Sequence, residues 1–295
     1  MSDRAKAEMT IFMITAIWGS SFIIMKNLLD DIPVFTYLTL RFAVASVALF
    51  FIFFRSLRIM KKRTLVLGIA IGLMLFLGMS LQVYGLKYTT ASRSAFITGL
   101  NVVMVPVISS VFLKKKPGLN SLIGVMLAVG GLFFLSGGLQ GRYNIGDILT
   151  LLCAFCFAFQ IILVDYSVAK EDAGCLALIQ VIFAAAACAL VWAGTEKGPV
   201  AIDIETAAAI IFTGLFATAF AFGGQTFAQK YTTPTRTALI ITFEPVFAAV
   251  FAAVIPNNSG MTEKLSQAVI IGCLLIFSGM VTAVLRPLRS RYFSS

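Results

Sequence analysis

One acidic residue lies near the middle of a long apolar stretch of the chain. Glu244 is part of "ITFEPVFAAV" and directly precedes Pro245. A carboxyl group in apolar surroundings can take up a proton, or it can bind a cation or an amine. Proline removes a backbone hydrogen bond and can kink a helix. Glu244 is therefore the first candidate for function. The alternative is a carboxylate held by hydrogen bonds that serve only packing.

Side-chain amides in other apolar stretches could complement this carboxyl group. Asn101 lies in one of them, Gln82 and Gln225 are expected toward opposite ends of two others, and Gln160 and Gln180 form a further pair. Amides in apolar surroundings can hydrogen-bond a polar ligand, or they can join helices to one another. The sequence leaves both roles open.

Three residues near the beginning of the chain could share such a site. Trp18, in "AIWGSSF", lies in mid-stretch, where it could line a cavity or pack against a neighbouring helix. Ser21 follows and could face the same cavity. Arg41 could extend its charge to a membrane surface, pair with Glu244, or bind a carboxylate.

The residue types argue against catalytic and metal chemistry. The chain has no histidine, and its five cysteines lie within or at the ends of apolar stretches. Cys153 and Cys156 form a single CxxC without a second pair. No paired catalytic acids and no GxxxxGK[ST] phosphate-binding loop occur. We therefore expect no catalytic residue, no metal, no cofactor and no enzyme.

The composition indicates helices in a membrane as the elements that position these residues. Of the 295 residues, 59% are hydrophobic and 12% are charged, and the mean hydropathy is +0.96. Soluble domains carry about 25% charged residues, whereas a bilayer-spanning helix needs about 20 apolar residues. Runs such as "VALFFIFF" lack the alternation of barrel strands. The net charge of +10 is explained by basic loops of a membrane protein, and no nucleic-acid partner is expected.

The apolar stretches predict an all-α membrane protein with ten transmembrane helices. They cover roughly residues 9–26, 34–54, 65–86, 92–113, 119–138, 147–165, 174–193, 207–229, 235–255 and 266–285. With a cytoplasmic N-terminus, sixteen Lys and Arg residues fall in cytoplasmic segments and six fall outside. This bias predicts both termini in the cytoplasm.

A repeated motif predicts that the ten helices form two halves. "KYTTASRSA" (87–95) and "KYTTPTRTA" (230–238) share six of nine residues at an offset of 143, which also pairs Asn101 with Glu244. Each copy reads as a turn followed by a capped helix start. Five spans per half reverse the orientation of the second half, as in the inverted repeats of many transporters. The predicted halves are residues 1–139 and 140–295. An offset of 139 aligns their first two spans more weakly.

Three segments resemble the drug/metabolite transporter superfamily, in its EamA branch. They are "AIWGSSFIIMK", "LQVYGLKYTTASRSAFITGLNVVMVPVIS" and "AQKYTTPTRTALIITFEPVFAAV". The resemblance covers nearly the whole chain and implies a carrier in the cytoplasmic membrane, with a central cavity between the halves. It carries over Trp18 and Gly19 of the first motif and Glu244 and Pro245 of the last. Phe157 departs from the pattern, because such proteins often have tryptophan there.

These observations predict a secondary transporter of a small organic metabolite that works by alternating access, and the resemblance implies export, above all of an amino acid or a related compound. Import or uncoupled diffusion of small solutes or drugs is the alternative, and a non-transport membrane protein or intramembrane enzyme is a distant one. Expected partners are the substrate, the lipid bilayer and a coupled proton at Glu244, in a monomer or a homodimer. The candidate substrate-binding residues are Trp18, Ser21, Arg41, Gln82, Asn101, Gln160, Gln225 and Glu244.

Overall fold

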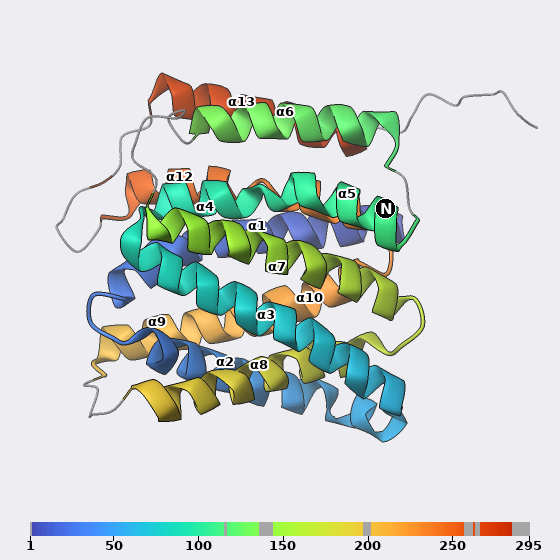
Figure 1. Cartoon of the computed structure of the whole chain (residues 1–295), viewed down its shortest axis with the longest axis vertical. Coiled ribbons are helices and arrows are strands. Elements are labelled where there is room, and N and C mark those ends of the chain that lie inside the picture. Colours follow the sequence, from blue (N-terminus) through green and yellow to red (C-terminus); the bar gives the residue numbers. More distant parts are fainter. Residues whose placement is uncertain are drawn as a thin grey trace, which may run out of the picture.

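The described part of the chain is a bundle of helices that run side by side (Figure 1). The computed structural model describes residues 2–114, 117–135, 144–196, 202–256, 262 and 266–284, and these ranges contain no β-strand. The first half contains α1 (Asp3–Leu28), α2 (Val34–Phe53), α3 (Lys62–Tyr88), α4 (Ala91–Gly99), α5 (Asn101–Phe112) and α6 (Leu119–Leu135). The second half contains α7 (Ile145–Val168), α8 (Ala173–Thr195), α9 (Ile204–Gly214), α10 (Ala221–Ala228), α11 (Pro234–Ile241), α12 (Glu244–Val254) and α13 (Gln267–Val284).

Length and hydropathy make the chain a multi-pass membrane protein. Eight helical spans of the described chain are long and apolar enough to cross a bilayer, and some of these spans consist of successive helices. α6 and α13 are shorter apolar helices. Large apolar side chains also cover the outside of the bundle: Phe51, Met126 and Leu190 are each more than 70% exposed. Such an exterior suits lipid rather than water.

Two of the spans are interrupted at mid-depth. α4 and α5 are separated by Leu100, so that Asn101 is the first residue of α5. α11 and α12 are separated by Thr242 and Phe243, so that Glu244 is the first residue of α12, followed by Pro245. A third span consists of α9, a π-helical turn named η2 (Leu215–Phe220), and α10. A π turn opens the backbone ladder and leaves carbonyl groups available to other partners.

The helices pack as pairs from the two halves. α2 packs on α8, α3 on α7 and α8, α1 on α10 and α12, and α4 and α5 on α7. α6 and α13 pair at one edge of the bundle (Figure 1). Glycines bring this last pair into close contact: a methyl group on Gly124 would lie 2.6 Å from the carbonyl oxygen of Gly279.

The two repeated motifs are turns followed by capped helix starts, as predicted. The hydroxyl group of Thr90 accepts from the backbone N–H of Arg93 at 3.2 Å, and that of Thr233 accepts from the N–H of Arg236 at 3.4 Å. The copy between α3 and α4 and the copy between α10 and α11 lie at opposite ends of the bundle (Figure 1). The predicted boundary between residues 139 and 140 lies outside the described residues.

Candidate functional site in the centre of the bundle

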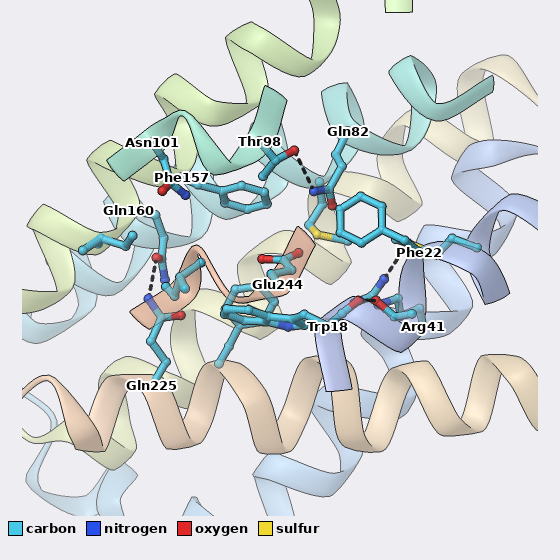
Figure 2. A pocket seen from close by; sticks show the side chains of 16 residues that line it. Trp18, Phe22, Arg41, Gln82, Thr98, Asn101, Phe157, Gln160, Gln225 and Glu244 are labelled. Carbon is cyan, nitrogen blue, oxygen red and sulfur yellow. Dashed lines mark hydrogen bonds between the residues drawn. The ribbon is translucent and has the colours of Figure 1, made fainter. Parts of the chain in front are cut away.

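A central cavity collects all eight candidate binding residues (Figure 2). Each of the eight side chains belongs to a residue that is less than one tenth exposed. Residues from α1, α2, α3, α4, α5, α7, α10, α11 and α12 contribute to the wall. The lining residues are Trp18, Ser21, Phe22, Met25, Arg41, Met79, Gln82, Thr98, Asn101, Phe157, Gln160, Ile161, Phe222, Gln225, Ile241 and Glu244.

Glu244 brings the carboxyl group to this cavity from the interruption between α11 and α12. A close contact between α1 and α12 fixes its position, since a methyl group on Gly19 would lie 2.9 Å from the Glu244 carbonyl oxygen and 2.8 Å from the amide nitrogen of Ala248. Within the described chain, Glu244 forms no ion pair within 4.0 Å, and this includes Arg41. The carboxyl group therefore lies at the cavity wall without a salt bridge to a described residue.

Arg41 is held by hydrogen bonds to the protein. Its Nε donates to the Thr218 hydroxyl group at 2.7 Å, and its Nη2 donates to the Ala217 carbonyl oxygen at 3.2 Å. Its Nη1 contacts the Tyr37 hydroxyl group at 3.1 Å and the Met25 sulfur at 3.2 Å. Arg41 is 1% exposed, so it does not extend its charge to a membrane surface. Most of its N–H groups have protein partners.

The π-helical turn η2 explains why Arg41 and Trp18 meet. The backbone N–H of Ala221, which would bond to Ala217 in a regular α-helix, donates to the carbonyl oxygens of Phe216 and Thr218 instead. The carbonyl oxygen of Ala217 accepts from the indole Nε1 of Trp18 at 2.9 Å, as well as from Arg41. Trp18 also packs against the ring of Phe222, with 5.3 Å between ring centroids. These contacts join α1, α2 and η2 into one wall of the cavity.

A chain of amides forms another wall. Gln225 donates to Gln160 at 3.2 Å and to Gln229 at 3.0 Å. Gln160 donates to Gln180 at 3.2 Å, and Gln180 donates to the Thr226 hydroxyl group at 2.9 Å. Both functional groups of the Gln160 amide are thus used to join α7, α8 and α10. Gln180 belongs to the chain of amides but does not line the cavity.

Two amide oxygens at the cavity have no hydrogen-bond partner in the described chain. They are Oδ1 of Asn101 and Oε1 of Gln225, on residues that are 2% and 1% exposed. Gln82 reaches the opposite side of the cavity (Figure 2) and donates to Thr98 at 3.3 Å. Buried polar atoms are usually satisfied. Together with the Glu244 carboxyl group, these oxygens are candidate acceptors for a ligand in the cavity.

The sequence did not single out several lining residues. Thr98 is the polar one, and its position one helical turn before Asn101 would have placed it on the same face. The apolar ones, such as Phe22, Met79 and Ile241, carry no signal that separates them from residues facing lipid. Phe157 fills part of the cavity wall, where the resemblance suggested that a tryptophan is common.

Comparison with known proteins places the chain among membrane transporters. The EamA-like transporter family matches residues 5–137 and 144–285. An uncharacterized transporter of Archaeoglobus fulgidus is 33% identical over 285 residues, covering 96% of this chain and 87% of that protein. The uncharacterized transporter YoaV of Bacillus subtilis is 23% identical, covering 93% of this chain and 95% of its own length.

A solved structure shares the fold. It is described only as "Crystal structure of protein", and it matches with a TM-score of 0.77 at 17% identity over 95% of this chain and 98% of its own. The sequence matches cover almost all of the helical bundle and both halves of the cavity wall. The chain therefore belongs to the EamA-like transporter family and is a membrane transporter.

Proposed function

We propose that this transporter is a secondary carrier that exports a small amine-bearing metabolite, above all an amino acid or a related compound, by alternating access. The observation that carries the proposal is the buried central cavity, in which, among the described residues, the Glu244 carboxyl group has no ion pair and two amide oxygens have no hydrogen-bond partner. The cavity lies between helices of both halves, and its polar side chains are buried. A central site between two repeats is what an alternating-access carrier exposes to each face of the membrane in turn.

The packing of the helices supports an inverted repeat of five spans in each half. A two-fold axis in the membrane plane would relate the contact between α3 and α7 to the contact between α1 and the third span of the second half. It would also relate the contact between α1 and α12 to the contact of α7 with α4 and α5. Each of these contacts occurs. The pairs α2 with α8 and α6 with α13 would map onto themselves, and they are in contact as well. With α6 and α13 counted, ten spans follow.

The polar groups of the cavity favour a ligand that donates hydrogen bonds. Glu244, Asn101 and Gln225 offer acceptor oxygens, whereas most donors of Arg41 are already engaged within the protein. A protonated amine matches this set, since it supplies three donors and a positive charge. The rings of Trp18 and Phe222 would contact the apolar part of the solute, and an aromatic face also attracts a cation.

Glu244 would serve both the solute and a coupled proton. A carboxylate can hold an ammonium group or a proton, but it cannot hold both at full strength. Binding one would therefore release the other, which is the requirement for exchange. We place the carrier in the cytoplasmic membrane with both termini inside, as a monomer or a homodimer, and without a cofactor.

A transport screen tests this proposal. The purified protein is reconstituted into liposomes, which are loaded with single unlabelled amino acids or amines and then given the labelled compound outside. We expect labelled uptake by counterflow for at least one amine-bearing solute, and faster flux when a proton gradient opposes the solute gradient. Uptake without any response to the proton gradient would favour the uncoupled carrier, and flux only of solutes without an amine would refute the proposed substrate class.

A further inference from the structure

Two ion pairs join the halves of the protein at its two ends. In the first, Nη2 of Arg93 lies 2.8 Å from Oδ2 of Asp147. Arg93 belongs to the first turn of α4 and Asp147 to the first turn of α7. Thr89, in the turn before α4, points its hydroxyl group at the same carboxylate, with 3.5 Å between Oγ1 and Oδ1. Asp147 is thus held by a cation and by a hydroxyl group from the other half.

The second ion pair has the same design at the other end. Nη1 of Arg236 lies 2.6 Å from Oε1 of Glu8. Arg236 belongs to the first turn of α11, and Glu8 lies near the start of α1. The hydroxyl group of Thr232, in the turn before α11, donates to the same carboxylate oxygen at 3.2 Å. Glu8 also pairs with Arg4 of its own helix at 2.9 Å.

These six residues occupy equivalent positions in the two halves. The offset of 143 that aligns the repeated motifs pairs Thr89 with Thr232 and Arg93 with Arg236. The offset of 139 that aligns the first spans pairs Glu8 with Asp147. The repeated "KYTT" motif and the residues that follow it therefore supply the same two groups, a threonine and an arginine, to an acid of the opposite half, once at each end of the bundle.

The ion pairs also stand at matching distances from the cavity. At the ordinary helical rise of about 1.5 Å per residue, Arg93 lies about 12 Å along the helix axis from Asn101. Arg236 lies at the same distance, about 12 Å, from Glu244. Asp147 precedes Gln160, and Glu8 precedes Ser21, by about 20 Å. Each pair thus clamps two cavity-lining spans together between the cavity and one end of the bundle.

We infer that these ion pairs are two alternating gates, one for each face of the membrane. This inference rests on the proposed alternating-access function and concerns the regulation of the same cavity. Access from one face requires α4 and α7, whose first turns contain Arg93 and Asp147, to separate. Access from the other face requires Arg236 and Glu8 to separate. Both pairs are closed in this structure, in agreement with the buried cavity. Charge-assisted bonds of this length favour the closed gate, and opening one gate leaves the other to hold the halves together.

A single cysteine in the cavity reports which gate is open. Ser21→Cys is introduced into a chain whose five native cysteines are replaced by alanine, and its labelling by a membrane-impermeant thiol reagent is timed from each face of sealed vesicles. Lys6→Cys and Tyr88→Cys, in separate chains, identify the Glu8 face and the Asp147 face. Arg93→Gln and Arg236→Gln each remove one gate. Arg4→Gln is the matched control, since it removes a cation from Glu8 without touching α11.

We expect Arg93→Gln to accelerate the labelling of the introduced cavity thiol about tenfold from the Asp147 face only, and Arg236→Gln to do so from the Glu8 face only. Arg4→Gln should leave both rates near those of the parent. Exchanging the charges, as in R93D with D147R or R236E with E8R, should restore slow labelling, which a folding defect would not allow.

The inference would be overturned if both variants accelerated labelling from the same face, or if neither accelerated it from any face. It would also be overturned if both charge exchanges failed to restore slow labelling. Counterflow of a solute by the parent protein, measured separately, distinguishes the two proposals. If the parent protein transports a solute but the variants leave the labelling rates unchanged, the gates are refuted. If the variants change the labelling rates as expected but the parent protein transports no amine, only the proposed substrate class is refuted.

Discussion

The cavity separates two kinds of buried amide, those that have protein partners on all sides and those that do not. Gln160 accepts from Gln225 and donates to Gln180, whereas Oδ1 of Asn101 has no partner in the described chain. The first kind holds helices together, and the second is available to a ligand. Substitution should therefore affect them differently.

Replacing the two amides by leucine should separate stability from binding. Asn101→Leu removes an acceptor that has no partner in the described chain, so the affinity for the transported solute should fall by about 1–3 kcal/mol, or roughly 5- to 150-fold, with little change in unfolding. Gln160→Leu removes the acceptor of one Gln225 hydrogen bond and the donor to Oε1 of Gln180, and it should lower the free energy of unfolding by about 1–3 kcal/mol.

Both effects can be measured in one reporter chain. Trp18 and Trp192 are the tryptophans of the protein, so Trp192→Phe leaves Trp18 in the cavity wall as the fluorophore. Solute titrations give the affinity, and thermal unfolding in detergent gives the stability. Equal loss of stability in the two variants would contradict the assignment of Asn101 to the ligand.

Arg41 illustrates a site residue whose interpretation the structure changes. Its sequence position left surface exposure, an ion pair with Glu244 and a carboxylate-binding role open, whereas its guanidinium is bonded to Thr218, Tyr37 and Ala217. Lysine cannot make this set of bonds from a single ammonium group. We expect Arg41→Lys to lower the melting temperature and to weaken the binding of amines with and without a carboxylate by the same factor. Selective loss of carboxylate-bearing solutes would instead restore the carboxylate-binding role.

At the scale of the elements, interrupted helices position the candidate binding groups. Asn101 and Glu244 each begin the second segment of a broken span, and the π turn η2 frees the Ala217 carbonyl oxygen for Trp18 and Arg41. The positions of the apolar stretches predicted where helices run, because hydropathy and loop charges are local properties. Among the described residues, the helices follow the expected stretches to within a few residues, apart from extensions such as the start of α1 and the end of the second span.

The interruptions themselves could not be predicted in detail. Pro245 pointed to a kink near Glu244, but the break before Asn101 comes several residues ahead of Pro106. The sequence of η2, "LFATAF", contains neither glycine nor proline. This turn depends on tertiary hydrogen bonds, since Thr218 bonds both to Thr213 and to Arg41 of another helix. Polar residues in apolar stretches predicted side chains that the structure brings together at one cavity, whereas the choice of their hydrogen-bond partners depends on packing between distant helices.

The contact between α1 and α12 allows a test of how an element positions Glu244. A methyl group on Gly19 meets backbone atoms of Glu244 and Ala248 at 2.9 and 2.8 Å, so the two helices must move apart. We expect Gly19→Ala to lower the free energy of unfolding by about 1–3 kcal/mol and to reduce solute flux. Gly194→Ala is the control, because nothing lies within 4 Å of its added methyl group, and it should stabilise α8 slightly. Equal behaviour of the two variants in thermal unfolding and flux would show that close packing at Gly19 is not required.

At the scale of the whole molecule, the proposed two-fold scheme combines equivalent helices with an unequal pair of residues at the centre. The contacts between helices repeat in the two halves, and so do the ion pairs at the two ends. At the cavity, however, the position equivalent to Glu244 holds Asn101. Two alternative states need equivalent halves, whereas binding one amine needs one carboxylate. We therefore assign movement to the symmetric features and chemistry to the asymmetric one.

The most direct test of the role of Glu244 is the flux of an amine-bearing solute through Glu244→Gln in liposomes, with Glu205→Gln, the same change at an exposed position, as the control. Counterflow without a gradient and flux driven by a proton gradient are measured on the same preparations. We predict that Glu244→Gln loses both activities by on the order of 100-fold, since the amide can hold neither the ammonium group at full strength nor the proton, while Glu205→Gln retains both. Counterflow by Glu244→Gln at the rate of the parent protein would contradict this role.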